Sequence, residues 1–209
     1  MVEVNLKNCD FHYAEHCCTD QKLINDFIDM FPLALITTFT NNTFHSSHIP
    51  LLRNADGTLF GHVDKNNPQF IGIHSIASKI VFTGPSSYIP PMAYSGPQLP
   101  TWNYLAVHVQ ANIEVIETEI RKLEILTQSA LRFAPDGCNY HVEPNDPRVI
   151  KNLPHILGIT VQPICLEARF KLSKDKPLAD HLSALEWLLK EQKYECKKSS
   201  AISSFIRKL

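Results

Sequence analysis

Polar turns separate short runs of apolar and β-branched residues over the first half of the chain. These runs predict extended strands over residues 33–40, 44–52, 58–63, 79–83 and 103–117. The dipeptides Asn41-Asn42 and Asp56-Gly57 lie between consecutive strands and are typical of hairpin turns. The long connection before the strand at 103–117 is rich in Pro, Tyr and Ser, and we interpret it as a rigid loop that lines a pocket.

Apolar residues at intervals of three and four predict helices elsewhere in the chain. The predicted helices cover residues 19–31, 69–77, 119–133, 146–152 and 178–192. Residues 156–172 supply one bent strand or two sequential strands. Because hairpins dominate and helices are inserted between them, this order predicts an α+β fold with a mostly antiparallel sheet, closed as a barrel, and peripheral helices.

Composition narrows the class of protein without identifying it. The chain has 209 residues, of which 44% are hydrophobic and 20% are charged, and its formal net charge is −1. These values are ordinary for a globular protein and give no positive field that would attract nucleic acid. No apolar run approaches the roughly 20 residues that span a bilayer, and residues 1–8 lack the layout of a signal peptide. We therefore expect one cytoplasmic domain over residues 1–209, with a C-terminal helical extension over residues 178–209.

Few local motifs indicate a metal or a phosphate loop. The six cysteines include no Cys-x-x-Cys pair, so reduced thiols are expected. His12 and His16 would share one face of a helix, with Cys17 next in the chain, but surface or capping histidines are the alternative, and without a His-Glu-x-x-His pattern we predict no metal site. With seven glycines and no Gly-rich phosphate loop, side chains would have to hold any phosphate. No strong nucleophile–base pair is evident, which leaves open whether the protein is an enzyme.

Five motifs occur along the chain in a specific order. They are Ser47-His48-Ile49-Pro50-Leu51, Gly61-His62-Val63 with Asn67-Pro68, Phe82-Thr83-Gly84-Pro85 with Tyr88-Ile89, Pro100-Thr101-Trp102-Asn103-Tyr104 with Val107-His108, and Phe170-Lys171-Leu172-Ser173. Over nearly its whole length the chain resembles the PaiB family, the FMN-binding negative transcriptional regulators. This resemblance implies a split β-barrel like that of pyridoxamine phosphate oxidases, FMN as the cofactor, and a homodimer with the flavin in a cleft between protomers.

The chain departs from the family pattern at several of these motifs. Lys65 stands where the family has an arginine, so bidentate recognition of a phosphate becomes a point charge. Residues 90–93 lack the family's tryptophan, which removes a large stacking surface, and Ala168-Arg169 replaces Gly-Lys. These departures imply weaker FMN binding or a different planar ligand.

The resemblance also implies which side chains bind the cofactor. They are His48, His62, Lys65, Asn67, Thr83, Tyr88, Trp102, Asn103, Tyr104, Arg169, Lys171 and Ser173. The histidines would donate to the ligand, the basic and hydroxyl groups would bind a phosphate, the aromatic rings would stack on the isoalloxazine, and Asn103 would bind its polar edge. Each role has an alternative. The histidines could be hydrogen-bonded in the core, the basic residues could lie at a solvated strand edge, and the hydroxyl groups could belong to a turn. The aromatic rings could pack in the core or in a dimer interface.

Three functions follow from these observations. The first is a flavin-binding regulator of the PaiB type that senses a ligand or a redox state. The second is an FMN-dependent oxidoreductase acting on a small planar substrate. The third is a haem-binding or cofactor-free relative, since histidines are possible haem ligands. The basic residues between Lys197 and Lys208 are the only hint of direct DNA binding, and no helix-turn-helix is evident.

Overall fold

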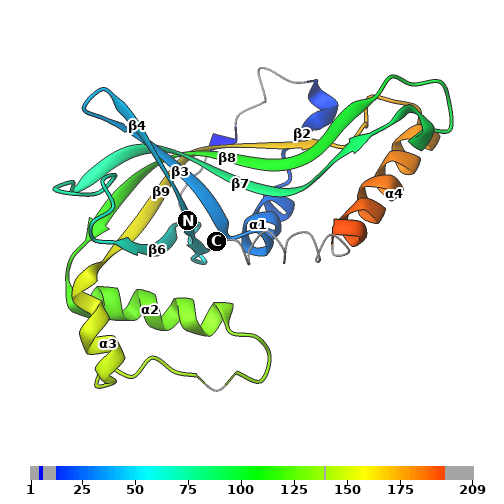
Figure 1. Cartoon of the computed structure of the whole chain (residues 1–209). Coiled ribbons are helices and arrows are strands. Elements are labelled where there is room, and N and C mark those ends of the chain that lie inside the picture. The colour runs from blue at the N-terminus through cyan, green and yellow to red at the C-terminus, as the bar shows by residue number, and fades with distance from the viewer. Residues whose placement is uncertain (1–4, 7–12, 139, 196–209) are drawn as a thin grey trace, which may run out of the picture. The chain divides into compact units, whose positions relative to one another are not determined.

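The computed structural model describes residues 5–6, 13–138 and 140–195, and these residues belong to two compact units. Unit 1 comprises residues 1–7, 21–82 and 107–167, and unit 2 comprises residues 8–20, 83–106 and 168–209. Three long strands, β7 (Ser75–Ile89), β8 (Thr101–Ile116) and β9 (Ile156–Lys171), supply residues to both units (Figure 1). His12 and the basic residues after 196 lie outside the described residues, as do their predicted roles.

The remaining elements are short strands and peripheral helices. The strands are β1 (Asn5–Leu6), β2 (Cys17–Cys18), β3 (Leu33–Thr40), β4 (Thr43–Pro50), β5 (Leu52–Arg53) and β6 (Leu59–Asp64). The α-helices are α1 (Gln21–Met30), α2 (Glu119–Phe133), α3 (Pro147–Asn152) and α4 (Leu178–Glu195). The 3₁₀ helices are η1 (Ala14–His16), η2 (Pro91–Ala93) and η3 (Leu153–His155). None of the helices in the described part of the chain is long and apolar enough to cross a membrane.

The strands form a mostly antiparallel sheet in the order β4-β3-β7-β8-β9-β6-β5, with β1 and β2 also paired to β9. The β3–β4 hairpin keeps register from Leu33 opposite Pro50 to Thr40 opposite Thr43. Asn41 and Asn42 form its turn with φ values of 50° and 58°, which asparagine tolerates and which match the twist of a two-residue hairpin. The turn predicted from Asn41-Asn42 is therefore confirmed.

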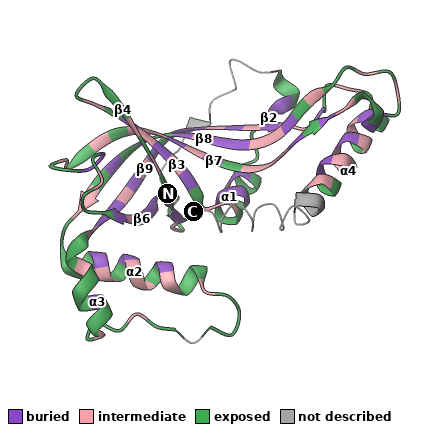
Figure 2. Ribbon diagram, viewed as in Figure 1, coloured by how far each residue is buried: buried purple, intermediate pink, exposed green. Residues whose placement is uncertain are grey.

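The core of unit 1 follows the predicted periodicities. Helix α1 buries Ile24, Phe27 and Ile28 on one side. Helix α2, which runs beside β6 in Figure 1, buries Lys122, Ile125 and Ser129 at intervals of three and four (Figure 2). Its buried Lys122 is satisfied because Nζ donates to the Leu153 carbonyl over 2.8 Å, which ties α2 to η3.

Unit 2 has a core of its own, built around α4. Ala184 and Leu188 of this helix pack with Ile89, Ala93 and Tyr94, and Leu105, Leu172 and Trp187 pack around them. The carboxylate of Asp180 accepts hydrogen bonds from the backbone N–H of Gly96 and from Gln98 Nε2, both over 2.8 Å. Helix α4 therefore holds the segment that leads from η2 into β8.

Most predicted elements are confirmed, but two expectations are wrong. Residues 69–77 are not helical: turns precede Ser75, where β7 begins. Gly72 has a φ of 68°, and the buried Gln69 amide donates to the carbonyls of Ile36 and His45 over 3.1 Å, so tertiary bonds replace helical ones. The expected loop after residue 83 is also shorter, because β7 continues through Gly84-Pro85 to Ile89. The extent of the domain, residues 1–209, stays a prediction.

Candidate functional site

A polar cluster in unit 2 contains three of the predicted cofactor-binding residues. Lys171 Nζ donates to Thr101 Oγ1 over 2.6 Å. Ser173 Oγ donates to Asn103 Oδ1 over 3.1 Å and lies 3.4 Å from the Tyr94 hydroxyl. Thr101 and Asn103 are two residues apart on β8, so their side chains share one face of that strand. The end of β9 and the start of β8 thus gather a cation, hydroxyls and an amide.

Burial sets the electrostatics of this cluster. Burial is the main cause that lowers the pKa of Lys171, while the nearby Asp175 raises it. Asn103 and Ser173 are 0% and 1% exposed, and Asn103 Nδ2 has no hydrogen-bond partner. A partly desolvated ammonium beside an unsatisfied buried donor favours an acceptor-rich group, since both gain from a negatively charged or carbonyl oxygen.

An aromatic pair occupies the opposite face of β8. The rings of Tyr88 and Trp102 lie 6.3 Å apart at 53°, and these residues are 49% and 55% exposed. Trp102 lies between Thr101 and Asn103 in the strand, so its side chain points away from the polar cluster, and Tyr104 follows on the side of Trp102. Strand alternation therefore divides the predicted unit 2 residues between two faces.

Other predicted residues lie apart from this cluster. In unit 1, His48 and Lys65 are exposed, and Asn67 Nδ2 donates to Ser47 Oγ over 3.0 Å. In unit 2, Thr83 is exposed on β7, and Arg169 is half-buried on β9 opposite Cys17.

His62 is half-buried and lines a hollow of unit 1, where burial lowers its pKa. Roles in cofactor binding for all these residues stay predictions. Among the described residues no group of three or more His, Cys, Asp or Glu is arranged to hold a metal ion.

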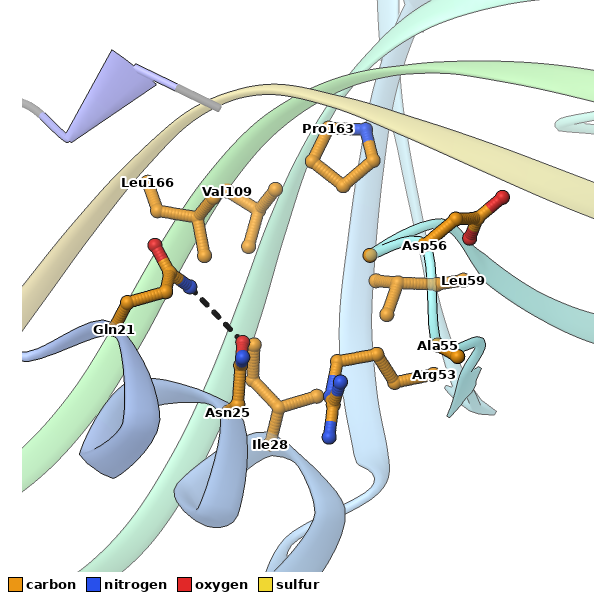
Figure 3. Close-up of a pocket in the computed structure, with 11 residues that line it drawn as sticks. Gln21, Asn25, Ile28, Arg53, Ala55, Asp56, Leu59, Val109, Pro163 and Leu166 are labelled. Carbon is orange, nitrogen blue, oxygen red and sulfur yellow. Dashed lines mark hydrogen bonds between the residues drawn. The ribbon is translucent and has the colours of Figure 1, made fainter. Parts of the chain in front are cut away.

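No motif in the sequence indicates a small pocket of unit 1 that lies between α1, the β5–β6 turn and β9. Its cavity has a volume of about 160 Å³, with Ile28, Leu59 and Val109 among its apolar lining (Figure 3). Its polar groups are already engaged: Gln21 Nε2 donates to Asn25 Oδ1 over 2.9 Å, and Asp56 accepts from Thr58. Its lining comes from segments far apart in the sequence, so no local motif reveals it.

The sequence and fold define the class of this protein. The chain belongs to the family described as "putative FMN-binding domain", whose model matches residues 11–163. It is 24% identical over 191 residues to the protease synthase and sporulation protein PAI 2 of Bacillus subtilis (strain 168), with 88% of this chain and 91% of that protein covered. An uncharacterized protein of Aspergillus fumigatus is 25% identical over 235 residues, with 83% and 88% covered. The resemblance to the PaiB family is confirmed.

Solved structures confirm the predicted fold class. A FAD- and heme-binding protein from Mycobacterium smegmatis superposes with a TM-score of 0.62 at 15% identity, covering 81% of this chain and 80% of that one. A flavocytochrome from Azotobacter vinelandii superposes with a TM-score of 0.61 at 14% identity, covering 76% and 71%. The chain has the α+β, mostly antiparallel fold of the split β-barrel proteins.

Proposed function

We propose that this protein is an FMN-binding regulator of the PaiB type that senses a ligand or the redox state of its flavin. The observation that carries the proposal is the cluster of Lys171, Thr101, Asn103 and Ser173 at the start of β8. Membership of the FMN-binding family supports the choice of ligand. When bound, the flavin would supply redox chemistry, and the protein would supply position and electrostatics.

Lys171 is the proposed phosphate contact. An ammonium has more than one N–H to donate, so the bond to Thr101 leaves donors for phosphate oxygens. Burial lowers the pKa of Lys171, and a bound dianion would raise it again by favouring the charged form. A phosphate at this position therefore offsets the cost of holding a half-buried cation.

Tyr88 and Trp102 are the proposed contacts for the isoalloxazine ring. Their half-exposed rings present an aromatic surface on the face of β8 opposite Lys171. Because one flavin cannot readily reach both faces of a strand, a homodimer in which the phosphate and ring contacts come from different protomers satisfies the geometry. This arrangement supports the homodimer predicted from the family resemblance. We also propose that the protein is cytoplasmic. Direct DNA binding has no support in the described residues.

An FMN-dependent oxidoreductase acting on a small planar substrate is the second candidate. The exposed aromatic pair favours it, because a planar substrate can stack where Trp102 leaves half of its surface open. A haem-binding relative is the third candidate, in view of the flavin- and heme-binding proteins that share the fold. An absorption spectrum of the purified protein separates flavin, haem and the absence of a chromophore.

Titration with FMN, followed by quenching of flavin fluorescence, tests the proposal. We expect saturable quenching that weakens at least tenfold in Lys171→Ala and in Trp102→Ala. Lys174→Ala and Leu99→Ala are matched controls, because both residues are exposed and neither belongs to the cluster or the aromatic pair. The absence of quenching, or equal losses in Lys171→Ala and Lys174→Ala, overturns the assignment.

A further inference from the structure

A second hollow of unit 1 lies where α2, α3 and η3 approach β6. Its volume is about 480 Å³, within the range of roughly 300–1,000 Å³ that small-molecule sites occupy. The lining is mostly apolar and includes Leu126, Ala130, Phe133, Val149 and Ile156. Phe133 and Tyr140 are 44% and 46% exposed, so the hollow is open to solvent beside aromatic rings.

The walls of this hollow are held in place by hydrogen bonds. Lys122 of α2 donates to the Leu153 carbonyl of η3 over 2.8 Å. Asp146 caps α3 by accepting from the backbone N–H of Arg148 over 2.8 Å. The first bond ties the β9 end of the connection between α2 and β9 to α2, and the second orders the start of α3, so these walls are positioned before a ligand binds, which lowers the entropic cost of binding.

The polar groups of the lining carry no net charge toward a ligand. Arg148 is the only lysine or arginine among the described lining residues, and its Nη2 and Nε donate to the Asp146 carboxylate over 2.5 Å and 3.1 Å. Asn152 Nδ2 donates to the Arg148 carbonyl over 2.8 Å. Burial lowers the pKa of His62 and so favours the neutral imidazole, which offers one donor and one acceptor.

We propose that this hollow binds a neutral, mostly apolar small molecule that carries one hydrogen-bonding group for His62. The apolar lining selects the body of the ligand, and the pairing of Arg148 with Asp146 disfavours an anion. A flavin phosphate would lose its hydration here without gaining an unpaired cation, so this site is separate from the proposed flavin site. The inference therefore does not depend on FMN binding.

Two matched fluorescent probes test the proposal on the full-length protein. N-phenyl-1-naphthylamine is neutral, and 1-anilinonaphthalene-8-sulfonate has the same ring system with an added negative charge. We expect the neutral probe to bind saturably at one site per chain, and the anionic probe to bind that site at least tenfold more weakly. Tighter binding of the anionic probe overturns the assignment of a neutral ligand.

Substitutions on α2 locate the bound probe. Ala130→Trp fills the hollow and is expected to weaken binding of the neutral probe at least tenfold. Leu131→Trp is the matched control, because residue 131 is 50% exposed and does not line the hollow, and it should change affinity less than twofold. Equal losses of probe affinity in the two variants overturn the assignment of the probe to this hollow.

Two further measurements do not depend on the folding of a variant. Saturating neutral probe should shift the imidazole NMR signal of His62 more than that of the exposed His48. FMN added to the complex should leave the probe bound. A larger shift at His48, or stoichiometric displacement of the probe by FMN, overturns the proposal of a separate site, whether or not FMN binds at Lys171.

Discussion

The ammonium group of Lys171 donates a 2.6 Å hydrogen bond to Thr101 Oγ1, which joins the last residue of β9 to the first residue of β8. Thr101→Val removes the acceptor and keeps the shape of the side chain. We expect the free energy of unfolding to fall by about 1 kcal/mol and FMN binding to weaken several-fold, because the ammonium loses the partner that orders it. Urea denaturation and FMN titration measure the two effects. Thr101→Ser keeps the hydroxyl and should retain both properties; equal behaviour of the two variants contradicts this prediction.

The bonds of Asp180 to the segment before β8 predict sensitivity to acid. Backbone donation from Gly96, followed by donation from Gln98, lowers the pKa of the Asp180 carboxyl below its ordinary 3.8. A depressed carboxyl pKa contributes stability that is present above pH 3.8 and is lost as the pH falls through the folded-state value. Asp180→Asn should lower the urea midpoint at neutral pH and should remove this part of the acid dependence.

The exposed Asp136 provides the control for Asp180. Asp136→Asn should leave the urea midpoint at neutral pH close to that of the wild-type protein. An Asp180→Asn variant that loses stability in acid as steeply as the wild type would show that this carboxylate is not responsible.

The burial of His62 predicts a second dependence on pH, in a higher window. Burial lowers the pKa of His62 from 6.5, so between the folded-state value and pH 6.5 the unfolded chain binds more protons than the folded one. The free energy of unfolding should therefore rise with pH through this window. Chemical denaturation at several pH values should show a shallower slope for His62→Phe than for the wild type.

Gly61 of β6 is required by a close approach of the backbone rather than by its φ. A Cβ atom at this position would lie 2.6 Å from the Pro50 carbonyl oxygen. Gly61→Ala should destabilise the protein by about 1–3 kcal/mol, since a backbone atom must move. At Gly72 a Cβ would meet open space, but φ is +68°, so Gly72→Ala should cost only about 1 kcal/mol. Thermal denaturation of the two variants measures which substitution lowers stability more. A larger loss of stability in Gly72→Ala than in Gly61→Ala would refute this prediction.

Periodicity predicted the elements whose buried faces are regular. Helix α2 has the predicted bounds, and β3 buries Ala34, Ile36 and Thr38 in strict alternation. The prediction failed at 69–77 because the buried Gln69 amide bonds to β3 and β4, which no local pattern reveals. It also failed at Gly84-Pro85, where turn-forming residues lie inside a strand because pairing outweighs local preference.

The candidate site was predicted in part. The motif around Trp102 and the Lys171-Leu172-Ser173 run identified side chains that the fold brings together within unit 2. The sequence alone was enough to predict that Trp102 and Asn103 lie on opposite faces of the strand, because neighbouring residues of a strand alternate between its two faces. By contrast, the hollow beside His62 depends on how α2, α3 and β6 pack, so only the tertiary structure reveals it.

The two-residue period of β8 has a consequence for how this protein can diversify. Thr101 and Asn103 are directed to the polar cluster, while Trp102 and Tyr104 are directed to the other side of the strand. A mutation at an even-numbered position can alter what stacks on the aromatic rings while the partners of Lys171 and Ser173 stay in place. Selection can then change which ligand stacks on the aromatic rings without changing the polar cluster that would hold its phosphate, although both sets of residues lie on the same strand.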